Sequence, residues 1–313
     1  MLQRPIHILV DALRTLGADI QYTGAEGYPP LHIRGKKLKG GTISVRADIS
    51  SQYISALMMI APYVENGLHI VLEGKISSGP YIEMTLALMR AMGAQAVLEG
   101  EHIRIEPTPY IAKDMQVESD WSAASYYFSC CALSPGSTIR LRGLFHYSLQ
   151  GDSVLPDLYA SLGVESHYVD DTWTLRHTGD RVAVFEKDFS DCPDLAQTVI
   201  VSCAALGIEA KCTGLESLRI KETDRTAALQ NELAKYNVDF FADGDAWHVK
   251  GKAEKVNDVH IQTYDDHRMA MAFAPLSISM GSIVLLDPDV VRKSYPSFWK
   301  DLALLGFRMD HSA

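Results

Sequence analysis

The sequence is poor in cysteine, in long apolar runs and in positive charge. Its 313 residues include five cysteines, an odd number with no pair at the Cys-x-x-Cys spacing of zinc sites. Most of them lie in apolar runs, as small buried side chains do in a reducing compartment, so we expect a cytoplasmic protein. No apolar run approaches the length of a membrane-spanning helix, and no membrane partner is expected.

The charge balance restricts the possible partners further. Lys and Arg number 29 against 39 Asp and Glu, which gives a formal net charge of −10 at pH 7. Nucleic acids and anionic membranes select a basic face, so we expect neither as a partner. A small anionic substrate remains possible, because Arg and Lys gathered in a cleft focus a positive field locally.

Several catalytic fingerprints are also missing from the sequence. It contains no Gly-x-Ser-x-Gly nucleophile elbow, no His-x-x-x-His metal pair, no Walker A loop and no dinucleotide-binding glycine motif. Asp266 next to His267 suggests part of a catalytic triad, but no nucleophile elbow accompanies them.

The densest charge cluster covers residues 219–225, Arg-Ile-Lys-Glu-Thr-Asp-Arg. It precedes residues 226–237, whose apolar side chains recur at helical spacing. The charges therefore crowd a helix N-terminus, where free N–H groups and the helix dipole favour an anion. Arg225 suits a phosphate or carboxylate clamp, and Glu222 is placed to move a proton. The alternative is a solvated charge run that only caps the helix.

The sequence repeats with a period of roughly 70 residues. One element is a polar capping pair, an Ala-rich apolar helix, a glycine and a strand; a second is a helix followed by two alternating strands. The first element predicts helices at 54–61, 123–133, 195–206 and 268–278, and the second at 9–16, 81–92, 155–162 and 226–236. The first helices are apolar nearly all round, which predicts an α/β fold with helices buried between sheets.

The starts of these helices carry polar side chains. Ser50, Ser51 and Ser78 offer hydroxyl and N–H groups to a phosphate, Gln52 adds an amide, and Tyr81 can stack on or hydrogen-bond a ring. Taken singly, each serine is better explained as an ordinary helix cap, and Tyr81 also fits a helix edge.

Three more candidates follow the same logic. Asp194 can take a hydroxyl proton or simply occupy the positive end of a helix dipole. Arg268 begins a long apolar helix, as an anion clamp or as a solvated start. Lys293 lies between a strand and a helix, where an exposed loop lysine is the simpler interpretation.

Together these segments resemble the 5-enolpyruvylshikimate-3-phosphate synthase family, over essentially the whole chain and in the family's order. The resemblance rests on Arg4-Pro5-Ile6, Ser50-Ser51-Gln52-Tyr53, Ser78-Gly79-Pro80-Tyr81, Pro193-Asp194, residues 219–225, residues 266–271 (Asp-His-Arg-Met-Ala-Met) and Lys293-Ser294-Tyr295-Pro296. It implies transfer of the enolpyruvyl group from phosphoenolpyruvate to the 5-hydroxyl of shikimate 3-phosphate with release of phosphate, a step of aromatic amino-acid (chorismate) biosynthesis.

The resemblance also implies a fold of repeated βαβαββ units in two domains, the inside-out α/β barrel of enolpyruvyl transferases. Residues 1–116 then form the remainder of the first domain, with about two units, and residues 117–313 form the second, with three. The Lys-Ser pair followed by Arg and the Gly-rich loop of the family's N-terminal part do not occur, so we expect the first domain to be incomplete and Met1 to mark a shortened chain. A monomer with no metal and no cofactor is expected.

Residue roles are implied by matching position. Asp194 and Glu222 resemble the two catalytic proton carriers. The implied contacts of shikimate 3-phosphate are Ser50, Ser51, Gln52, Ser78, Tyr81, Asp194, Ser217 and Lys221. The implied contacts of phosphoenolpyruvate are Arg4, Gln52, Arg225, Arg268 and Lys293. Ser217 is a departure, because some members carry Asn there.

Two alternatives remain open. UDP-N-acetylglucosamine enolpyruvyl transferase shares the fold. A non-catalytic fragment would bind shikimate 3-phosphate and turn nothing over, because loss of one preorganised donor can cost about 10²–10³ in rate. On that second alternative we expect little or no activity.

Overall fold

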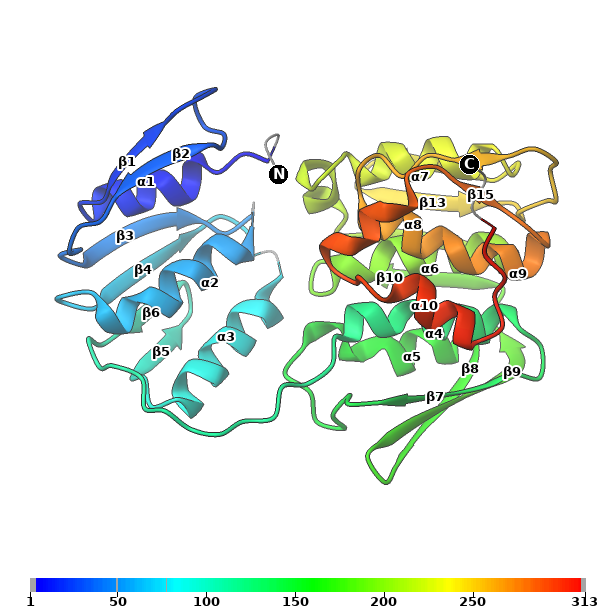
Figure 1. Ribbon diagram of the computed structural model, residues 1–313, viewed down its shortest axis with the longest axis horizontal. Helices are drawn as coiled ribbons and strands as arrows, with labels where there is room; N and C mark the ends of the chain where they lie inside the picture. Colours follow the sequence, from blue (N-terminus) through cyan, green and yellow to red (C-terminus); the bar gives the residue numbers. More distant parts are fainter. Residues whose placement is uncertain (1–3, 49, 77, 311–313) are drawn as a thin grey trace.

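The computed structural model describes residues 4–48, 50–76 and 78–310, so Met1, at which the sequence predicts an abrupt start, lies outside these ranges. Figure 1 shows two bodies side by side, residues 4–105 and residues 121–310, joined by a segment at 106–120 that forms neither helix nor strand. Each body has its own hydrophobic cluster, drawn from residues 12–105 and 121–302. The division into domains at residues 116 and 117 stays a prediction.

The first body contains one complete βαβαββ unit. The sheet has the order β3-β4-β6-β5, with β3 and β4 parallel and the other neighbours antiparallel. The elements are α1 (His7–Thr15), β1 (Asp19–Tyr22), β2 (Leu31–Arg34), β3 (Gly41–Arg46), α2 (Ser51–Ile60), β4 (Leu68–Glu73), α3 (Gly79–Ala91), β5 (Ala96–Glu99) and β6 (His102–Ile105). The β1–β2 hairpin with α1 is a partial copy, as its sequence predicts.

The second body repeats this topology. One of its sheets, β10-β11-β13-β12, has the same order and strand directions as β3-β4-β6-β5. The elements are α4 (Trp121–Leu133), β7 (Thr138–Arg142), α5 (Leu155–Ala160), β8 (Leu162–Val169), β9 (Thr172–Arg181), β10 (Val184–Asp188), α6 (Ala196–Leu206), β11 (Glu209–Thr213), α7 (Arg225–Ala234), β12 (Asp239–Asp243), β13 (Ala246–Lys250), β14 (His260–Ile261), α8 (His267–Phe273), α9 (Ser277–Met280), β15 (Val284–Leu285) and α10 (Phe298–Leu304). The predicted α/β repeat is therefore present in the fold.

The apolar helices are buried, as their composition predicts. Every residue of α6 is buried, and it packs against α4 and α8 in the middle of the second body (Figure 1). Four buried hydroxyls of α4 and α6 bond in pairs: Ser125 donates to Thr198 at 3.1 Å and Ser202 to Ser129 at 2.8 Å. Pairing removes the cost of burying them.

Two local predictions differ from the structure. The helix predicted at 268–278 is broken into α8 and α9 by a 3₁₀ turn at Ala274–Leu276, where Pro275 supplies no N–H to continue the ladder. The helix predicted at 155–162 ends at Ala160, and Gly163 lies inside β8 at a bulge with φ of 88°. The ideal position of a Cβ there is 3.4 Å from the Gly179 backbone.

We predict that Ile200→Ala lowers the free energy of unfolding by about 2–5 kcal/mol, because Ile200 is fully buried in α6 and the cavity cannot collapse. Urea unfolding measures the loss. Ile33→Ala on the exposed face of β2 is the matched control and should cost less than about 1 kcal/mol. Equal losses in the two variants would contradict a core centred on α6.

Candidate active site

Three chain segments of the second body meet around the guanidinium of Arg225, the first residue of α7 and only 2% exposed. Its Nε donates to Asp266 Oδ2 at 2.7 Å, its Nη1 to Asp194 Oδ1 at 3.2 Å and its Nη2 to Glu222 Oε2 at 3.0 Å. One side chain therefore binds three carboxylates, two of which, Asp194 and Asp266, are more than 30 residues away in the sequence. Such planar, forked donation is available only to arginine.

Capping aspartates hold the segments in place. Asp224 accepts from the backbone N–H groups of Thr226 and Ala227, both at 3.1 Å, and so fixes the start of α7. Asp266, 0% exposed, caps α8 by accepting from the N–H of Arg268 at 2.8 Å through Oδ1, while Oδ2 receives Arg225. Each cap thus places a cation at a helix start.

Asp194 lies in the short 3₁₀ helix Pro193–Leu195, among three cations. Arg268 Nη2 donates to its Oδ2 at 2.8 Å, and Lys221 Nζ lies 3.9 Å from its Oδ1. Burial raises the pKa of Asp194, but Arg268, Lys221 and Arg225 outweigh it and hold that pKa well below its usual range. Asp194 is consequently ionised at neutral pH.

Glu222 is the second ionised carboxylate of the cluster. It accepts from Lys293 and Arg225, and Arg4 Nη1 approaches its Oε1 to 3.9 Å. Burial opposes its charge, but the Lys293 hydrogen bond and the Arg225 charge lower the pKa of Glu222 to about 2. The chain's fourth residue thus reaches a site made by residues beyond 190.

The cluster carries an excess of positive charge. Its basic side chains are Arg4, Lys221, Arg225, Arg268 and Lys293, and the carboxylates that pair with them are Asp194, Glu222 and Asp266. Five cations against three anions leave two positive charges. His267 adds none at neutral pH, because burial and the Arg268 charge lower its pKa to about 4.

The first body presents its predicted site residues at the starts of α2 and α3, which face the second body (Figure 1). Ser50 is the N-cap residue of α2 but makes no side-chain cap bond, Ser51 is buried and Gln52 is exposed. Ser78 is the N-cap of α3, and the Tyr81 hydroxyl donates to Asp152 Oδ1 of the second body at 3.2 Å. Among the described contacts, none joins the α2 residues to the Arg225 cluster.

Ser217 and Lys221 belong to the turn before α7. Ser217 is buried in the 3₁₀ helix Glu216–Ile220, and its hydroxyl has no hydrogen-bond partner among the described residues. Lys221 follows directly; burial lowers its pKa, and Asp194 partly offsets this. The Ser217 hydroxyl and the Lys221 ammonium thus both lie in the turn that leads into α7.

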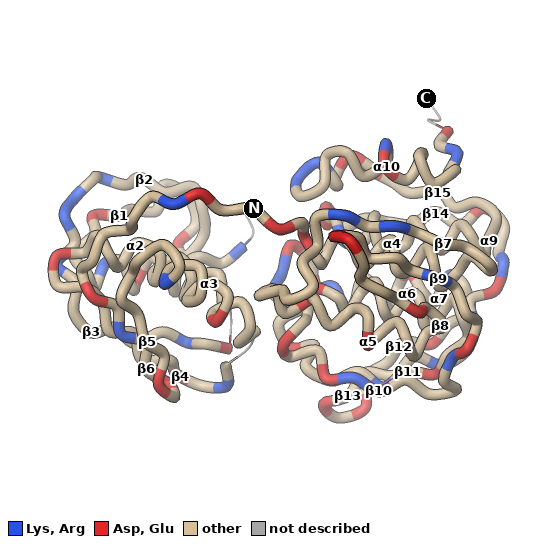
Figure 2. The backbone as a smooth tube through the Cα atoms, turned by 90° about the horizontal axis from the view of Figure 1, so that it is seen from below, with Lys and Arg blue, Asp and Glu red and all other residues tan. Residues whose placement is uncertain are grey.

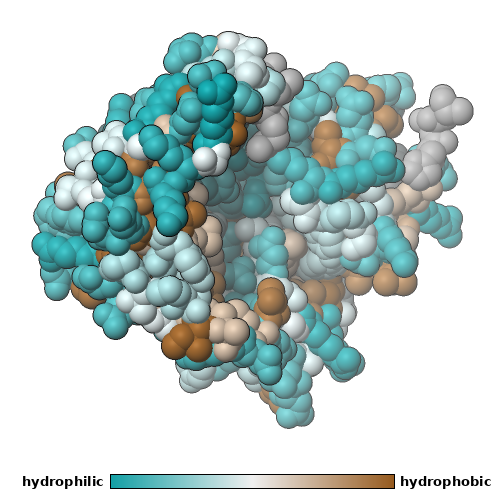
Figure 3. All heavy atoms as spheres, turned by 60° about the vertical axis from the view of Figure 1, so that its left-hand side comes forward, coloured by the Kyte–Doolittle hydropathy of each residue, from teal (hydrophilic) through white to brown (hydrophobic). Residues whose placement is uncertain are grey.

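The two bodies enclose a recess. Figure 2 shows acidic and basic positions interspersed along the side of the second body that faces the first, and Figure 3 shows hydrophilic side chains around the hollow between them. Arg4 and Tyr81 both contact the second body across this region. Through these two contacts the first body reaches the Arg225 cluster, by way of Arg4, and Asp152, by way of Tyr81.

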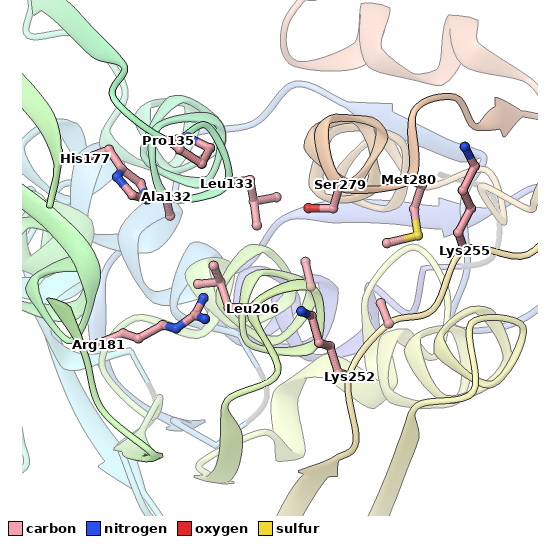
Figure 4. A pocket seen from close by; sticks show the side chains of 12 residues that line it. Ala132, Leu133, Pro135, His177, Arg181, Leu206, Lys252, Lys255, Ser279 and Met280 are labelled. Carbon is pink, nitrogen blue, oxygen red and sulfur yellow. The ribbon is translucent and has the colours of Figure 1, made fainter. Parts of the chain in front are cut away.

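A separate cavity of about 320 Å³ lies near the other ends of the buried helices (Figure 4). Leu133 and Leu206, the last residues of α4 and α6, form its apolar floor, and Arg181, Lys252 and Lys255 line it. Helix C-termini present carbonyl groups and negative dipole ends, which these cations offset. This cavity therefore contains none of the candidate catalytic residues.

Asp266 and Asp152 are not among the site residues that the sequence predicts. Asp266 belongs to the 266–271 motif without a predicted contact of its own, and no pattern in the sequence points to Asp152. A capping aspartate has the same local pattern whether or not its other oxygen binds a cation. No local signal marks Asp152, whose partner Tyr81 is 71 residues away.

Within the described residues, His, Cys, Asp and Glu form no group of three or more suited to hold a metal ion. A search of the same residues for a helix with the length and apolarity needed to cross a bilayer finds none.

Comparison with known proteins decides the family. A family model described as EPSP synthase (3-phosphoshikimate 1-carboxyvinyltransferase) matches residues 1–302. The chain belongs to this family. It is therefore a transferase of the enolpyruvyl transferase fold, as its sequence predicts.

Individual relatives agree. A Bacteroides fragilis protein named 3-phosphoshikimate 1-carboxyvinyltransferase is 48% identical over 311 residues, which cover 98% of this chain and 76% of the relative. A Haemophilus influenzae protein of the same name is 34% identical over 310 residues, covering 96% and 70%. A solved EPSP synthase from Acinetobacter baumannii superimposes with a TM-score of 0.72 at 22% identity, covering 97% of this chain and 71% of that one.

We predict that Arg225→Ala lowers the free energy of unfolding by about 3–5 kcal/mol, because it leaves the buried carboxylate of Asp266 without its cation. Urea unfolding measures the change. Arg219→Ala, in the same charge cluster but exposed, is the control and should cost less than about 1 kcal/mol. A loss below 1 kcal/mol for Arg225→Ala would show that the three carboxylates do not depend on it.

Glu222 predicts a dependence of stability on pH. Its pKa is about 2 in the folded chain against an ordinary 4.5, so the ionised form stabilises the fold above pH 4.5 and that stabilisation is lost as pH falls through 2. As the pH falls from 4.5 to 2, the free energy of unfolding should decrease more in the wild type than in Glu222→Gln, and the difference should amount to a few kcal/mol. Denaturation midpoints across this range test it, and parallel curves would refute it.

Proposed function

We propose that this chain transfers the enolpyruvyl group of phosphoenolpyruvate to the 5-hydroxyl of shikimate 3-phosphate, releasing phosphate. The proposal rests above all on two ionised carboxylates, Asp194 and Glu222, bridged by the guanidinium of Arg225. Addition to a double bond followed by elimination needs one group for the hydroxyl proton and another for the carbon proton. Two separate carboxylates with cations beside each meet that need.

The cations bind phosphoenolpyruvate. Its carboxylate and phosphate compete with Asp194 and Glu222 for Arg225, Arg268 and Lys293, and Arg4 closes the site from the first body. The excess of two positive charges favours a multiply charged anion. Withdrawing Arg225 and Lys293 from Glu222 raises its pKa, which lets Glu222 hold a proton.

Proton transfer then proceeds in two stages. In the addition, Asp194 takes the 5-hydroxyl proton while the oxygen bonds to C2 of phosphoenolpyruvate, and Glu222 donates a proton to C3. In the elimination, Glu222 removes a proton from the new methyl group, the C2–O bond to phosphate breaks, and Asp194 returns its proton to the departing phosphate. Each carboxylate ends the cycle in its starting state.

Shikimate 3-phosphate binds on the side of the first body that faces the Arg225 cluster. Ser50, Ser51 and Ser78, at the starts of α2 and α3, bind its phosphate, because N–H groups and hydroxyls converge at helix N-termini. Its ring and hydroxyls contact the remaining predicted residues, Gln52, Tyr81, Asp194, Ser217 and Lys221. Gln52 also reaches phosphoenolpyruvate.

We further propose that the chain acts as a monomer in the cytoplasm and binds neither nucleic acid nor membrane. All five cysteines are free and buried, as in proteins of reducing compartments. The net charge of −10 disfavours polyanionic partners.

Phosphate release from phosphoenolpyruvate plus shikimate 3-phosphate tests the reaction. We predict that Asp194→Asn and Glu222→Gln each lower kcat by at least about 10², because each removes a group that moves a proton. Arg268→Lys should mainly raise the KM for phosphoenolpyruvate, since it replaces a forked donor with a point charge.

Arg219→Ala, outside the cluster of paired charges, should leave kcat unchanged. Binding of shikimate 3-phosphate by calorimetry without any phosphate release would reject the transferase reaction in favour of a binding role alone. Phosphate release with UDP-N-acetylglucosamine as the acceptor, and not with shikimate 3-phosphate, would identify the chain as a UDP-N-acetylglucosamine enolpyruvyl transferase instead.

A further inference from the structure

The two bodies touch at a small polar seam, formed by Ser78, Pro80 and Tyr81 of the first body and Gly151, Asp152 and Ser190 of the second. The N–H of Ser78 donates to the carbonyl of Ser190 at 2.9 Å, and the Tyr81 hydroxyl donates to Asp152. The helix start that we assign to shikimate 3-phosphate is thereby fastened to the body that carries Asp194.

Asp152 is the buried centre of this seam. It is 2% exposed, lies in the 3₁₀ helix Gly151–Val154 before α5, and accepts from the Ser122 hydroxyl of α4 through one oxygen and from Tyr81 through the other. Among the described contacts, no cation forms an ion pair with it. Unlike Asp194 and Glu222, it is held by neutral hydroxyls alone.

We propose that Asp152 is a positioning residue for the shikimate 3-phosphate side of the site. Its carboxylate holds the Tyr81 hydroxyl across the seam, and so sets the placement of Tyr81 and Ser78 against Asp194 and Arg268. Asp152 itself does not touch the reacting atoms. The effect of Asp152 on the binding of shikimate 3-phosphate rests on the proposed function. Its hydrogen bond to Tyr81, which holds the two bodies together, does not.

Close packing supports a fixed seam. A Cβ built on Gly151 would lie 2.8 Å from the Cβ of Pro80 and 2.9 Å from the carbonyl oxygen of Asp191. No side chain fits there without moving the bodies apart. Gly151→Ala therefore opens the seam by bulk alone, without altering any charge.

The seam depends on the charge state of Asp152. Burial and the nearby Asp194 charge raise the pKa of Asp152 to about 6. The Ser122 hydrogen bond, the Arg268 charge and the Tyr81 hydrogen bond act in the opposite direction and lower it. The buried thiol of Cys192 is also close to Asp152. Above pH 6 both oxygens accept; below it a proton occupies one of them. Because this pKa is raised, protonation favours the fold while it weakens the seam.

The first measurement needs no substrate. Hydrogen exchange of the Ser78 amide reports its bond to Ser190. We expect Gly151→Ala, Tyr81→Phe and Asp152→Asn each to lower its protection about fivefold or more, the loss of roughly one hydrogen bond. Tyr168→Phe is the matched control, since the Tyr168 hydroxyl also donates to an aspartate, Asp171, but on the exposed surface.

The second measurement is the affinity for shikimate 3-phosphate by calorimetry, at about pH 7.5 and about pH 5.5. The ligand's own phosphate titrates in this range, so the comparison is between variants. Wild type should lose about fivefold more affinity on acidification than Asp152→Asn, with no such difference for phosphoenolpyruvate.

Unchanged Ser78 protection in Gly151→Ala and Asp152→Asn would overturn the inference whatever the chain catalyses. Equal pH dependence in wild type and Asp152→Asn would also overturn it. Altered protection in a chain that releases no phosphate would support the seam and reject the proposed function instead.

Discussion

The site depends on one buried guanidinium. Arg225 links Asp194, Glu222 and Asp266, which come from three separate segments, and each of these carboxylates would be costly to bury without a cation. Asp266 in turn caps α8 and so orients Arg268 toward Asp194. The same contacts that make the cluster stable therefore keep ionised the two carboxylates that we propose as proton carriers, and link them through one guanidinium.

The repeated unit explains why polar groups converge there. A βαβαββ unit places the starts of both its helices at the same end of the sheet, and the two bodies face each other with these ends (Figure 1). Backbone N–H groups at helix starts attract anions wherever they lie. Because the two bodies face each other, several helix starts can act together. In the proposed function the serines bind the phosphate of one substrate and the cations bind the phosphate of the other.

The sequence alone predicts several of the helices and the charged cluster of the site. Apolar periodicity predicts the bounds of α3 and α7 to within about two residues. The sequence pattern does not predict the strands β3 and β10. They form parallel pairs with partners supplied by another part of the chain, and short runs such as Gly41–Arg46 carry little local signal. The charged cluster at 219–225 was visible because so many charges at one helix start require partners, but the roles of Asp266 and Asp152 depend on contacts 41 and 71 residues distant.

The local excess of two cations has a kinetic consequence. A chain of net charge −10 repels an approaching, multiply charged substrate anion at long range. The cluster attracts that anion only once it has entered the recess. The screening length is about 8 Å at physiological ionic strength, shorter than the span of either body. Dissolved salt thus hides the repulsive exterior from a diffusing substrate more completely than it weakens the attraction in the partly buried interior. Capture by this molecule is a short-range event, governed by the last few ångströms of approach.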